Sequence, residues 1–354
     1  MTYIPDTLSQ KNNYVLLYQV DAKIDMNVIQ EVLSRAKVDT NDYEILSFIP
    51  SIDRRPDSNK EWKSVCRESS EWLLELKRKI AFFPNKPTFH VFSHAPIPLA
   101  VYFGALLLSW DKIISYQYNQ TDNSWYPWAD APDKNDFFEV VSQPTEDTAK
   151  DILLLISVTR PVIEHARNLK VYENNKNNVL CLNAKTISQN SVASSAVAIK
   201  AANEIVTKLD QMIDNNPNIK NIHLFLAGPV ALAFLVGRKI NPNVFPNVIV
   251  YNFFPRQNPV YRGVCQINKS SLSNTVKKYI SLGKHPVVKA INFVLVFFIL
   301  ALGIIVVYKL VSKEFGQASW CVFSLILMIT LLMFEMIHQE TFEEFIRQRF
   351  FGEK

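Results

Sequence analysis

An internal repeat constrains the fold of this chain more than any other feature. The segment TFHVFSHAPIPLAVYFG (residues 88–104) returns as NIHLFLAGPVALAFLVG (residues 221–237) at a constant offset. In both copies an apolar run of strand length leads through a tight turn into an apolar helix. A repeat determines the architecture of a whole chain, so the sequence predicts two similar halves docked together. Six positions are identical, with His90, Phe92, Pro96, Leu99, Ala100 and Gly104 recurring as His223, Phe225, Pro229, Leu232, Ala233 and Gly237.

The segments around the repeat alternate strands with helices. This alternation is typical of βαβ units and a mostly parallel sheet. The predicted fold class is therefore α/β, with two tandem Rossmann-type halves. The same offset aligns Tyr118-Asn119 with Tyr251-Asn252 and predicts no insertion there. The expected strands are 14–20, 43–49 and 112–118 in the first half and 152–158, 178–183, 222–226, 248–254 and 260–267 in the second, and the expected helices are 24–36, 59–80 and 191–214.

The composition changes between the two halves. Residues 125–128, WYPW, are interpreted as the return strand of a hairpin, and the Asp- and Pro-rich sequence after them as a connector. We expect the last two strands of the second half to form a hairpin at the sheet edge. In the helix 191–214 the spacing of apolar residues predicts a buried face. That face comprises Val192, Ala196, Ile199, Val206, Leu209 and Ile213.

The C-terminal part of the chain is far more apolar than the two halves before it. Two nearly unbroken apolar segments, residues 287–311 and 319–338, are each as long as the roughly 20 residues that cross a bilayer. Buried core helices are the alternative, but they would need a very large soluble core. Lysines cluster before the first segment, which predicts a transmembrane hairpin with both ends cytoplasmic. The predicted domains are a first half (1–130), a connector (131–150), a second half (151–280), two spans (287–311 and 319–338) and a cytoplasmic tail (339–354).

Known catalytic and metal-binding motifs are missing from the sequence. Its eight glycines form neither GxGxxG nor GxxxxGK[ST], and GxSxG and HExxH are also absent. Four cysteines lack metal-ligand spacing, so we expect free thiols in a reducing compartment. The net charge of +5 is too mild for a large nucleic-acid surface. No signal peptide precedes the first strand. We therefore expect no catalytic residue, no metal and no cofactor.

The architecture itself predicts where a ligand would bind. In open parallel α/β sheets, ligands bind beyond the carboxyl ends of the strands, where helix N-termini favour phosphates. Arginine and lysine side chains there are suited to phosphate, and His94 and Phe254 to stacking on bases. Two such halves would enclose a pocket suited to a cyclic polyanion. The candidate ligand-binding residues are Arg54, Arg55, Ser93, His94, Ser157, Thr159, Arg160, Lys185, Gly228, Phe254 and Arg256.

Several of the conspicuous side chains have structural interpretations. We expect His90 and His223, at the starts of their strands, to make structural hydrogen bonds, and Trp125 and Trp128 to belong to the core. Arg54 and Arg55 follow Asp53 and could form a solvated surface pair instead of a phosphate site.

The repeat and its surroundings resemble a known family. The paired HxFxxxPxxLAxxxG units and the strand ILLLISVTRPV (residues 152–162) resemble the SAVED domain, two fused CARF-like halves, over about residues 10–270. The resemblance implies a sensor of a cyclic oligonucleotide, commonly a trinucleotide, made by a partner nucleotidyltransferase in bacterial CBASS anti-phage operons. With two spans in the effector position, the chain looks like a 2TM–SAVED protein of the inner membrane. Such a protein would form homo-oligomers on binding ligand and disrupt the bilayer in abortive infection, without binding DNA or RNA polymers.

Three alternatives remain open at this point. The first is a type III CRISPR accessory effector that senses cyclic oligoadenylate. The second is a membrane-tethered ring nuclease that degrades the same messenger. The third is a structural membrane protein with a degenerate fold.

Overall fold

The computed structural model describes residues 4–5, 8–39, 41–52, 54–81, 83–119, 124–127, 136–145, 148–192 and 194–268. These residues all belong to one compact unit, Met1–Thr275. The predicted spans 287–311 and 319–338, the tail 339–354 and Trp128 lie outside the described residues. Within the described ranges, no helix combines the length and hydropathy needed to cross a bilayer.

The first half is built on a five-stranded sheet with the order β2-β1-β3-β4-β5. Its first four strands are parallel, and β5 returns antiparallel to β4, which confirms the predicted hairpin. The elements are β1 (Asn13–Gln19), α1 (Met26–Arg35), β2 (Tyr43–Phe48), α2 (Asn59–Ile80), β3 (Thr88–His94), α3 (Ile97–Leu106), β4 (Ile113–Asn119) and β5 (Ser124–Pro127).

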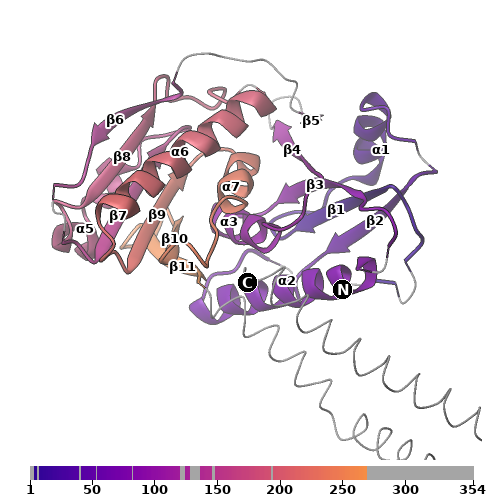
Figure 1. The fold of residues 1–354 in the computed structure, drawn as a ribbon, viewed down its shortest axis with the longest axis horizontal. Helices are drawn as coiled ribbons and strands as arrows, with labels where there is room; N and C mark the ends of the chain where they lie inside the picture. The colour runs from indigo at the N-terminus through magenta and orange to yellow at the C-terminus, as the bar shows by residue number, and fades with distance from the viewer. Residues whose placement is uncertain are drawn as a thin grey trace, which may run out of the picture. The chain divides into compact units, whose positions relative to one another are not determined.

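The second half repeats this plan in a six-stranded sheet with the order β11-β10-β9-β7-β8-β6. Read from β8 to β11, its strands follow the same order as β2 to β5, so the internal repeat corresponds to a repeated topology (Figure 1). The α/β prediction is confirmed, with each sheet mixed at its edges. The elements are β6 (Phe138–Ser142), β7 (Asp151–Ser157), α4 (Ile163–Ala166), α5 (Lys170–Asn174), β8 (Val179–Ala184), α6 (Ser195–Asn215), β9 (Asn221–Ala227), α7 (Val230–Gly237), β10 (Asn247–Phe253) and β11 (Tyr261–Ile267).

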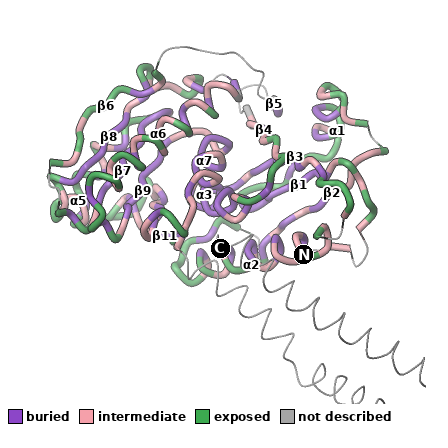
Figure 2. Tube along the Cα trace, in the orientation of Figure 1, coloured by how far each residue is buried: buried purple, intermediate pink, exposed green. Residues whose placement is uncertain are grey.

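The central strands of both sheets are buried on both faces, as Figure 2 shows along their length. In β7, Leu154 faces a core shared by the two halves, and its neighbours Leu153 and Leu155 face a separate core under α4. Such two-sided burial explains why these strands have continuous apolar sequences instead of alternating ones.

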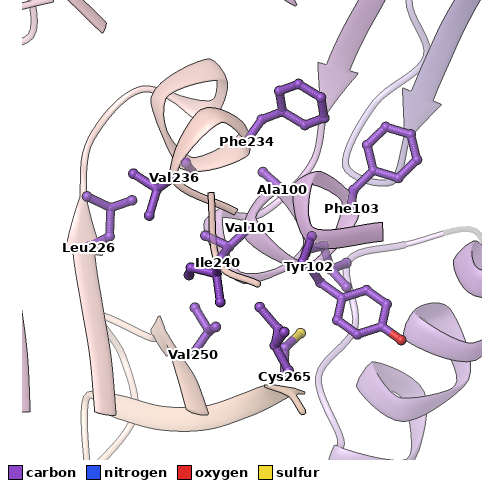
Figure 3. Packing of buried hydrophobic residues seen from close by; sticks show 14 of the residues in the cluster. Ala100, Val101, Tyr102, Phe103, Leu226, Phe234, Val236, Ile240, Val250 and Cys265 are labelled. Atoms are coloured by element: carbon purple, nitrogen blue, oxygen red, sulfur yellow. The ribbon is translucent and has the colours of Figure 1, made fainter. Parts of the chain in front are cut away.

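The repeat glycines make the closest approach between the halves. A Cβ atom on Gly104 of α3 would lie 2.1 Å from the carbonyl oxygen of Phe234, and one on Gly237 of α7 would lie 2.0 Å from that of Val101. These contacts are reciprocal, since each glycine meets the equivalent position of the other helix. The two halves are therefore related by a local pseudo-twofold axis between α3 and α7, and glycine occurs at the repeat's end because the backbones touch there. Figure 3 shows the side chains around this contact, among them Phe103 and Phe234, whose ring centroids are 5.9 Å apart.

The loop between the repeat's helix and the next strand contains an insertion that the sequence alignment missed. His90 pairs with Ile114, whereas its equivalent His223 pairs with Ile249. The structural counterpart of Tyr251 is therefore Tyr116, and the prediction of an alignment without insertion was wrong. The constant offset held only through the helix, because an exposed helix-to-strand loop can lengthen without changing the core.

The predicted connector contains a strand. β6 lies antiparallel to β8 at the outer edge of the second sheet. Its single buried side chain is Phe138, and Val141 is exposed. The alternation of side chains is too weak in this short edge strand to distinguish it from loop.

The buried face of α6 also differs from the prediction. Ile199 is 44% exposed, whereas Ala198, Ala202 and Ile205 are fully buried. Small alanines suit a close neighbour, and α7 is the described element whose backbone comes closest to α6. The buried face of α6 is therefore set by residue size as well as by hydrophobicity.

Candidate ligand site at the carboxyl edges of the two sheets

The end of β7 forms a hydrogen-bonded turn at the carboxyl edge of the second sheet. The backbone N–H groups of Val158 and Thr159 both donate to the carbonyl oxygen of Ala227, at 2.8 and 3.0 Å. The Ser157 hydroxyl accepts from Val162 N at 3.1 Å, and this side chain is fully buried. Ser157 therefore holds the turn in place, which leaves Thr159 as the first half-buried side chain of the edge.

The end of β1 forms the same turn in the first half. Val20 and Asp21 donate from their backbone N–H groups to the carbonyl oxygen of His94, at 2.8 and 2.9 Å. The Gln19 side chain takes the place of the serine and accepts from Ile24 N at 2.6 Å. The two carboxyl edges thus carry equivalent backbone frames with different side chains.

An exposed arginine stacks on an aromatic ring in the second half. The Cζ atom of Arg160 lies 3.8 Å from the centroid of the Phe253 ring, and Tyr261 packs against that ring at 5.1 Å. A stacked guanidinium keeps its edge free to donate hydrogen bonds while its face is supported. Arg160 is therefore preorganised as a contact for a phosphate or a base.

The first half has an aromatic cluster at the corresponding edge. His94 is half-buried and lies edge-on to Tyr118 and Trp125, with centroid distances of 4.6 and 5.0 Å. Desolvation lowers the pKa of His94, so its imidazole favours the neutral form and serves as a stacking or hydrogen-bonding surface rather than a cation. Trp125 is only 2% exposed, which confirms it as core.

The loop between β2 and α2 crosses to the second half. Arg55 Nη2 donates to Asn252 Oδ1 at 3.3 Å, and its Nε lies 3.9 Å from the carboxylate of Asp21. Gln257, in the β10–β11 hairpin, donates to Asp57 Oδ1 at 3.2 Å. Residues nearly 200 positions apart in the chain therefore meet at this edge.

Arg54 does not share this arrangement. Its guanidinium pairs with Glu61 at 2.5 Å. Hydrogen bonds from the backbone N–H groups of Ser58 and Asp57 lower the pKa of Glu61 to about 2 and hold its carboxylate at the start of α2. Arg54 therefore forms a surface ion pair with Glu61, and Asp53 lies outside the described residues.

A second contact joins the edges at the start of α7. Gln117 Oε1 accepts from the backbone N–H of Ala231 at 3.2 Å. Gly228 and Pro229 form the turn just before this helix, and a Cβ atom on Gly228 would meet its neighbours at an ordinary 3.5 Å. The first sheet's carboxyl edge thus adjoins the amino end of α7, where Gln117 accepts from Ala231. The amino end of a helix favours an anion.

The remaining candidates lie apart from these contacts. Lys185 and Arg256 are exposed, and Phe254 packs edge-on against Trp62 with Arg262 over its ring at 4.5 Å. Ser93 is buried, and its hydroxyl has no hydrogen-bond partner among the described residues. Phe254 therefore serves packing, Ser93 is inaccessible, and Lys185 and Arg256 stay accessible as cations in addition to Arg160.

Sequence reasoning missed Phe253, Gln117 and Asn252. Phe253 was overlooked in favour of Phe254, although strand alternation places these neighbours on opposite faces. Gln117 and Asn252 become equivalent once the two-residue insertion is allowed for, so a structure-based alignment of the repeat would have found both.

His90 and His223 have the structural role expected of them. The Nδ1 atom of His90 lies 2.8 Å from the hydroxyl of Tyr116, and that of His223 lies 3.0 Å from the hydroxyl of Tyr251. Within the described part of the chain, no three His, Cys, Asp or Glu side chains gather as metal ligands. A cavity of about 150 Å³ lies elsewhere, at the amino ends of β7 and β8, and is lined by Ile152, Leu180, Lys208 and Asn216 among others.

Comparison with known proteins identifies the family. Residues 67–267 match the family model described as SMODS-associated and fused to various effectors sensor domain, SAVED. The chain therefore belongs to the SAVED family. No curated protein is similar to it in sequence.

Two similar solved structures are of the Acinetobacter baumannii Cap4 SAVED/CARF-domain containing receptor. The one with the cyclic trinucleotide 2'3'3'-cAAA has a TM-score of 0.51 and 12% identity, and the match covers 72% of this chain and 51% of that one. The one with 3'3'3'-cAAA has a TM-score of 0.50 at the same identity and coverage. This chain thus matches about half the length of those receptors, and at such low identity the likeness concerns the fold.

Proposed function

We propose that this chain is a receptor that binds a cyclic oligonucleotide of the trinucleotide class at the adjoining carboxyl edges of its two sheets. One observation supports this most strongly: a SAVED-family chain carries two equivalent backbone turns, at Val158-Thr159 and at Val20-Asp21, on either side of a local pseudo-twofold axis. A cyclic ligand with repeated phosphates matches a site with repeated backbone geometry.

The groups at the two edges would contact different parts of the ligand. Arg160 and the N–H groups at the start of α7 would contact phosphates. His94 in the first half would stack on one base, and the guanidinium plane of Arg160, supported by Phe253, would stack on another in the second half. Because the side chains differ between the halves, the bases of one ligand would meet unequal surroundings.

Membrane disruption is the proposed output. The apolar segments 287–311 and 319–338 would anchor the protein in a bacterial inner membrane with both ends cytoplasmic. Ligand made by a partner nucleotidyltransferase would drive homo-oligomerisation and thereby cluster the spans. The chain would act in this way as a CBASS effector in anti-phage abortive infection.

We further propose that the receptor does not consume its ligand. The sequence carries no nucleophile or metal motif. The alternative to exclude is a ring nuclease, which would open the cyclic messenger.

The test is a binding and recovery experiment on residues 1–280. Calorimetric titration with cyclic triadenylates is expected to saturate, with linear triadenylate as the control that does not. Chromatography after long incubation should return the cyclic compound unchanged. Steady conversion to linear product would contradict the receptor and favour the nuclease.

A further inference from the structure

A pair of thiols bridges the two halves away from the proposed ligand site. Cys66 lies on α2 of the first half and Cys265 on β11 of the second, and their sulfur atoms are 3.4 Å apart. The two residues are separated by 199 positions in the sequence. Helix α2 packs on β11 here, so the sulfur atoms meet across the boundary between the halves.

A β-bulge directs Cys265 to this boundary. On β10, Tyr251 pairs with Gly263 and the preceding residue Val250 pairs with Cys265. Val264 is therefore left without a partner, and the bulge reverses the alternation of side chains. Tyr261, before the bulge, faces the core under α4, whereas Cys265 faces the core shared by the two halves. Without this extra residue its thiol would point away from Cys66.

The surroundings leave the two thiols to each other. The nearby hydroxyls of Tyr18 and Tyr102 are within hydrogen-bond distance of Ser69 and Ser70, at 2.8 and 2.7 Å. Figure 3 shows Cys265 beside Tyr102 in the shared core. Burial raises the pKa of the Cys265 thiol, so it is unreactive by itself.

The two cysteines differ in accessibility. Cys265 is 3% exposed, whereas Cys66 is only partly buried. A small oxidant can therefore reach the Cys66 sulfur first, and the Cys265 sulfur is already in contact with the Cys66 sulfur. This is the arrangement of an accessible thiol beside a resolving thiol.

We propose that Cys66 and Cys265 form an oxidation site at which a peroxide converts the thiol pair into a reversible disulfide between the halves. The Cys66 sulfur attacks one peroxide oxygen, the O–O bond breaks, and the departing hydroxide takes a proton to give water. The Cys265 sulfur then attacks the resulting sulfenic acid, an S–S bond replaces the S–O bond, and the Cys265 proton leaves with the hydroxide as a second water. Two thiols are oxidised and one peroxide is reduced.

The disulfide would constrain the chain strongly. It would close a loop over residues 66–265, which contains β3 to β10, and join α2 covalently to β11. A cross-link over such a separation removes many conformations from the unfolded chain. Oxidation should therefore raise the resistance of the two halves to unfolding, and reduction should reverse the effect.

The test uses full-length protein purified in detergent, treated with hydrogen peroxide and then blocked with N-ethylmaleimide. Peptide mapping should find one cross-linked peptide joining Cys66 to Cys265, which dithiothreitol removes. The melting temperature should rise by about 5–15 °C on oxidation. Cys66→Ser should abolish both changes, and the control Cys181→Ser, at another buried cysteine, should keep both.

Other products would overturn the proposal. These are sulfinic acid at Cys66 without a cross-link, or a cross-link from Cys66 to a second molecule. Cys66→Ser changes a partly exposed side chain and should fold, so the comparison does not depend on the buried Cys265→Ser variant.

Discussion

Arg160 offers a sharp test at the scale of single residues. It is exposed and stacked on Phe253, so Arg160→Ala should weaken binding of the cyclic ligand without changing the melting temperature. A hydrogen bond to a charged group contributes about 1.5–3 kcal/mol, so the loss should be roughly 10- to 150-fold. Arg160→Lys keeps the charge but loses the planar stacking on Phe253, so its affinity for the ligand should lie between those of the wild type and Arg160→Ala. Titration calorimetry measures all three.

Arg256→Ala provides a second arm of the same test. Arg256 is exposed in the β10–β11 hairpin, and its replacement by alanine should also weaken binding of the cyclic ligand. Arg35→Ala is the matched control, because Arg35 is paired with Glu31 on α1 away from the site. Unchanged affinity in both the Arg160 and Arg256 variants would place the ligand elsewhere.

His90 makes a prediction about pH. Desolvation lowers its pKa from 6.5 to about 4 in the folded protein. Between these values the unfolded chain binds a proton that the folded protein does not, so the free energy of unfolding should fall as the pH drops from 6.5 to 4. The side chain is 2% exposed, and the full loss amounts to about 3 kcal/mol.

Urea denaturation of residues 1–280 at a series of pH values measures this loss. The free energy of unfolding of His90→Gln should depend less steeply on pH than that of the wild type. Between pH 4 and 6.5 the difference in slope should reach about 1.4 kcal/mol per pH unit. Parallel curves for the two proteins would show that His90 takes up its proton in the folded state.

At the scale of secondary-structure elements, the contact between α3 and α7 holds the halves together. Gly104→Ala would place a methyl group 2.1 Å from a backbone oxygen of the opposite helix, and the helices would have to separate. Overpacking of a tight core costs typically 1–3 kcal/mol, which corresponds to a drop in melting temperature of about 2–12 °C for a domain of this size. Gly237→Ala should behave alike, because the contact is reciprocal.

Gly228→Ala is the matched control for this contact. Its added methyl group would meet neighbours at 3.5 Å, so it should leave the melting temperature within about 2 °C of the wild type, as ordinary substitutions away from tight contacts do. Equal losses at all three glycines would argue against a special closeness of α3 and α7.

The elements themselves were largely predictable from the sequence. The bounds of α2 follow from its amphipathic pattern and from the Ser58–Glu61 capping box, and the buried strands follow from their apolar runs. The edge strand β6 and the buried face of α6 were not predictable in this way. Both depend on neighbouring elements, since β6 is defined by its pairing with β8, and the alanines on the buried face of α6 suit the close approach of α7.

At the scale of the whole molecule, the site was only partly predictable. The rule that ligands meet the carboxyl ends of strands selects the loops at that edge, and their role in binding stays a prediction. It could not show that Arg55 crosses to Asn252 or that Arg54 is paired with Glu61. The contact of Arg55 with Asn252 depends on the docking of the halves, and no local pattern encodes partners that lie 197 positions apart. The pair of Arg54 with Glu61 is local and depends on how the loop before α2 bends.

The proposed membrane effect should require both parts of the molecule at once. The predicted spans contain a single glycine, Gly303, and few polar side chains, so strong self-association is not expected from them alone. Assembly of the sensor domains on ligand would raise the local concentration of the spans and supply the missing association. Cells with full-length protein and its activating nucleotide should therefore depolarise and take up an impermeant dye.

Residues 284–354 alone, or full-length protein without a nucleotide source, are the controls and should leave the membrane intact. Depolarisation in either control would contradict gating by assembly. If a nucleotide that binds the protein caused neither depolarisation nor dye uptake, the hairpin would be a passive anchor.

The most direct measurement is titration of the purified full-length protein with a panel of cyclic trinucleotides that differ in base and linkage. We predict saturable binding of at least one member, loss of that binding in Arg160→Ala, and recovery of the intact ring by chromatography. Failure of every cyclic compound to bind, or conversion of the bound ring to a linear product, would contradict the assignment of this chain as a receptor.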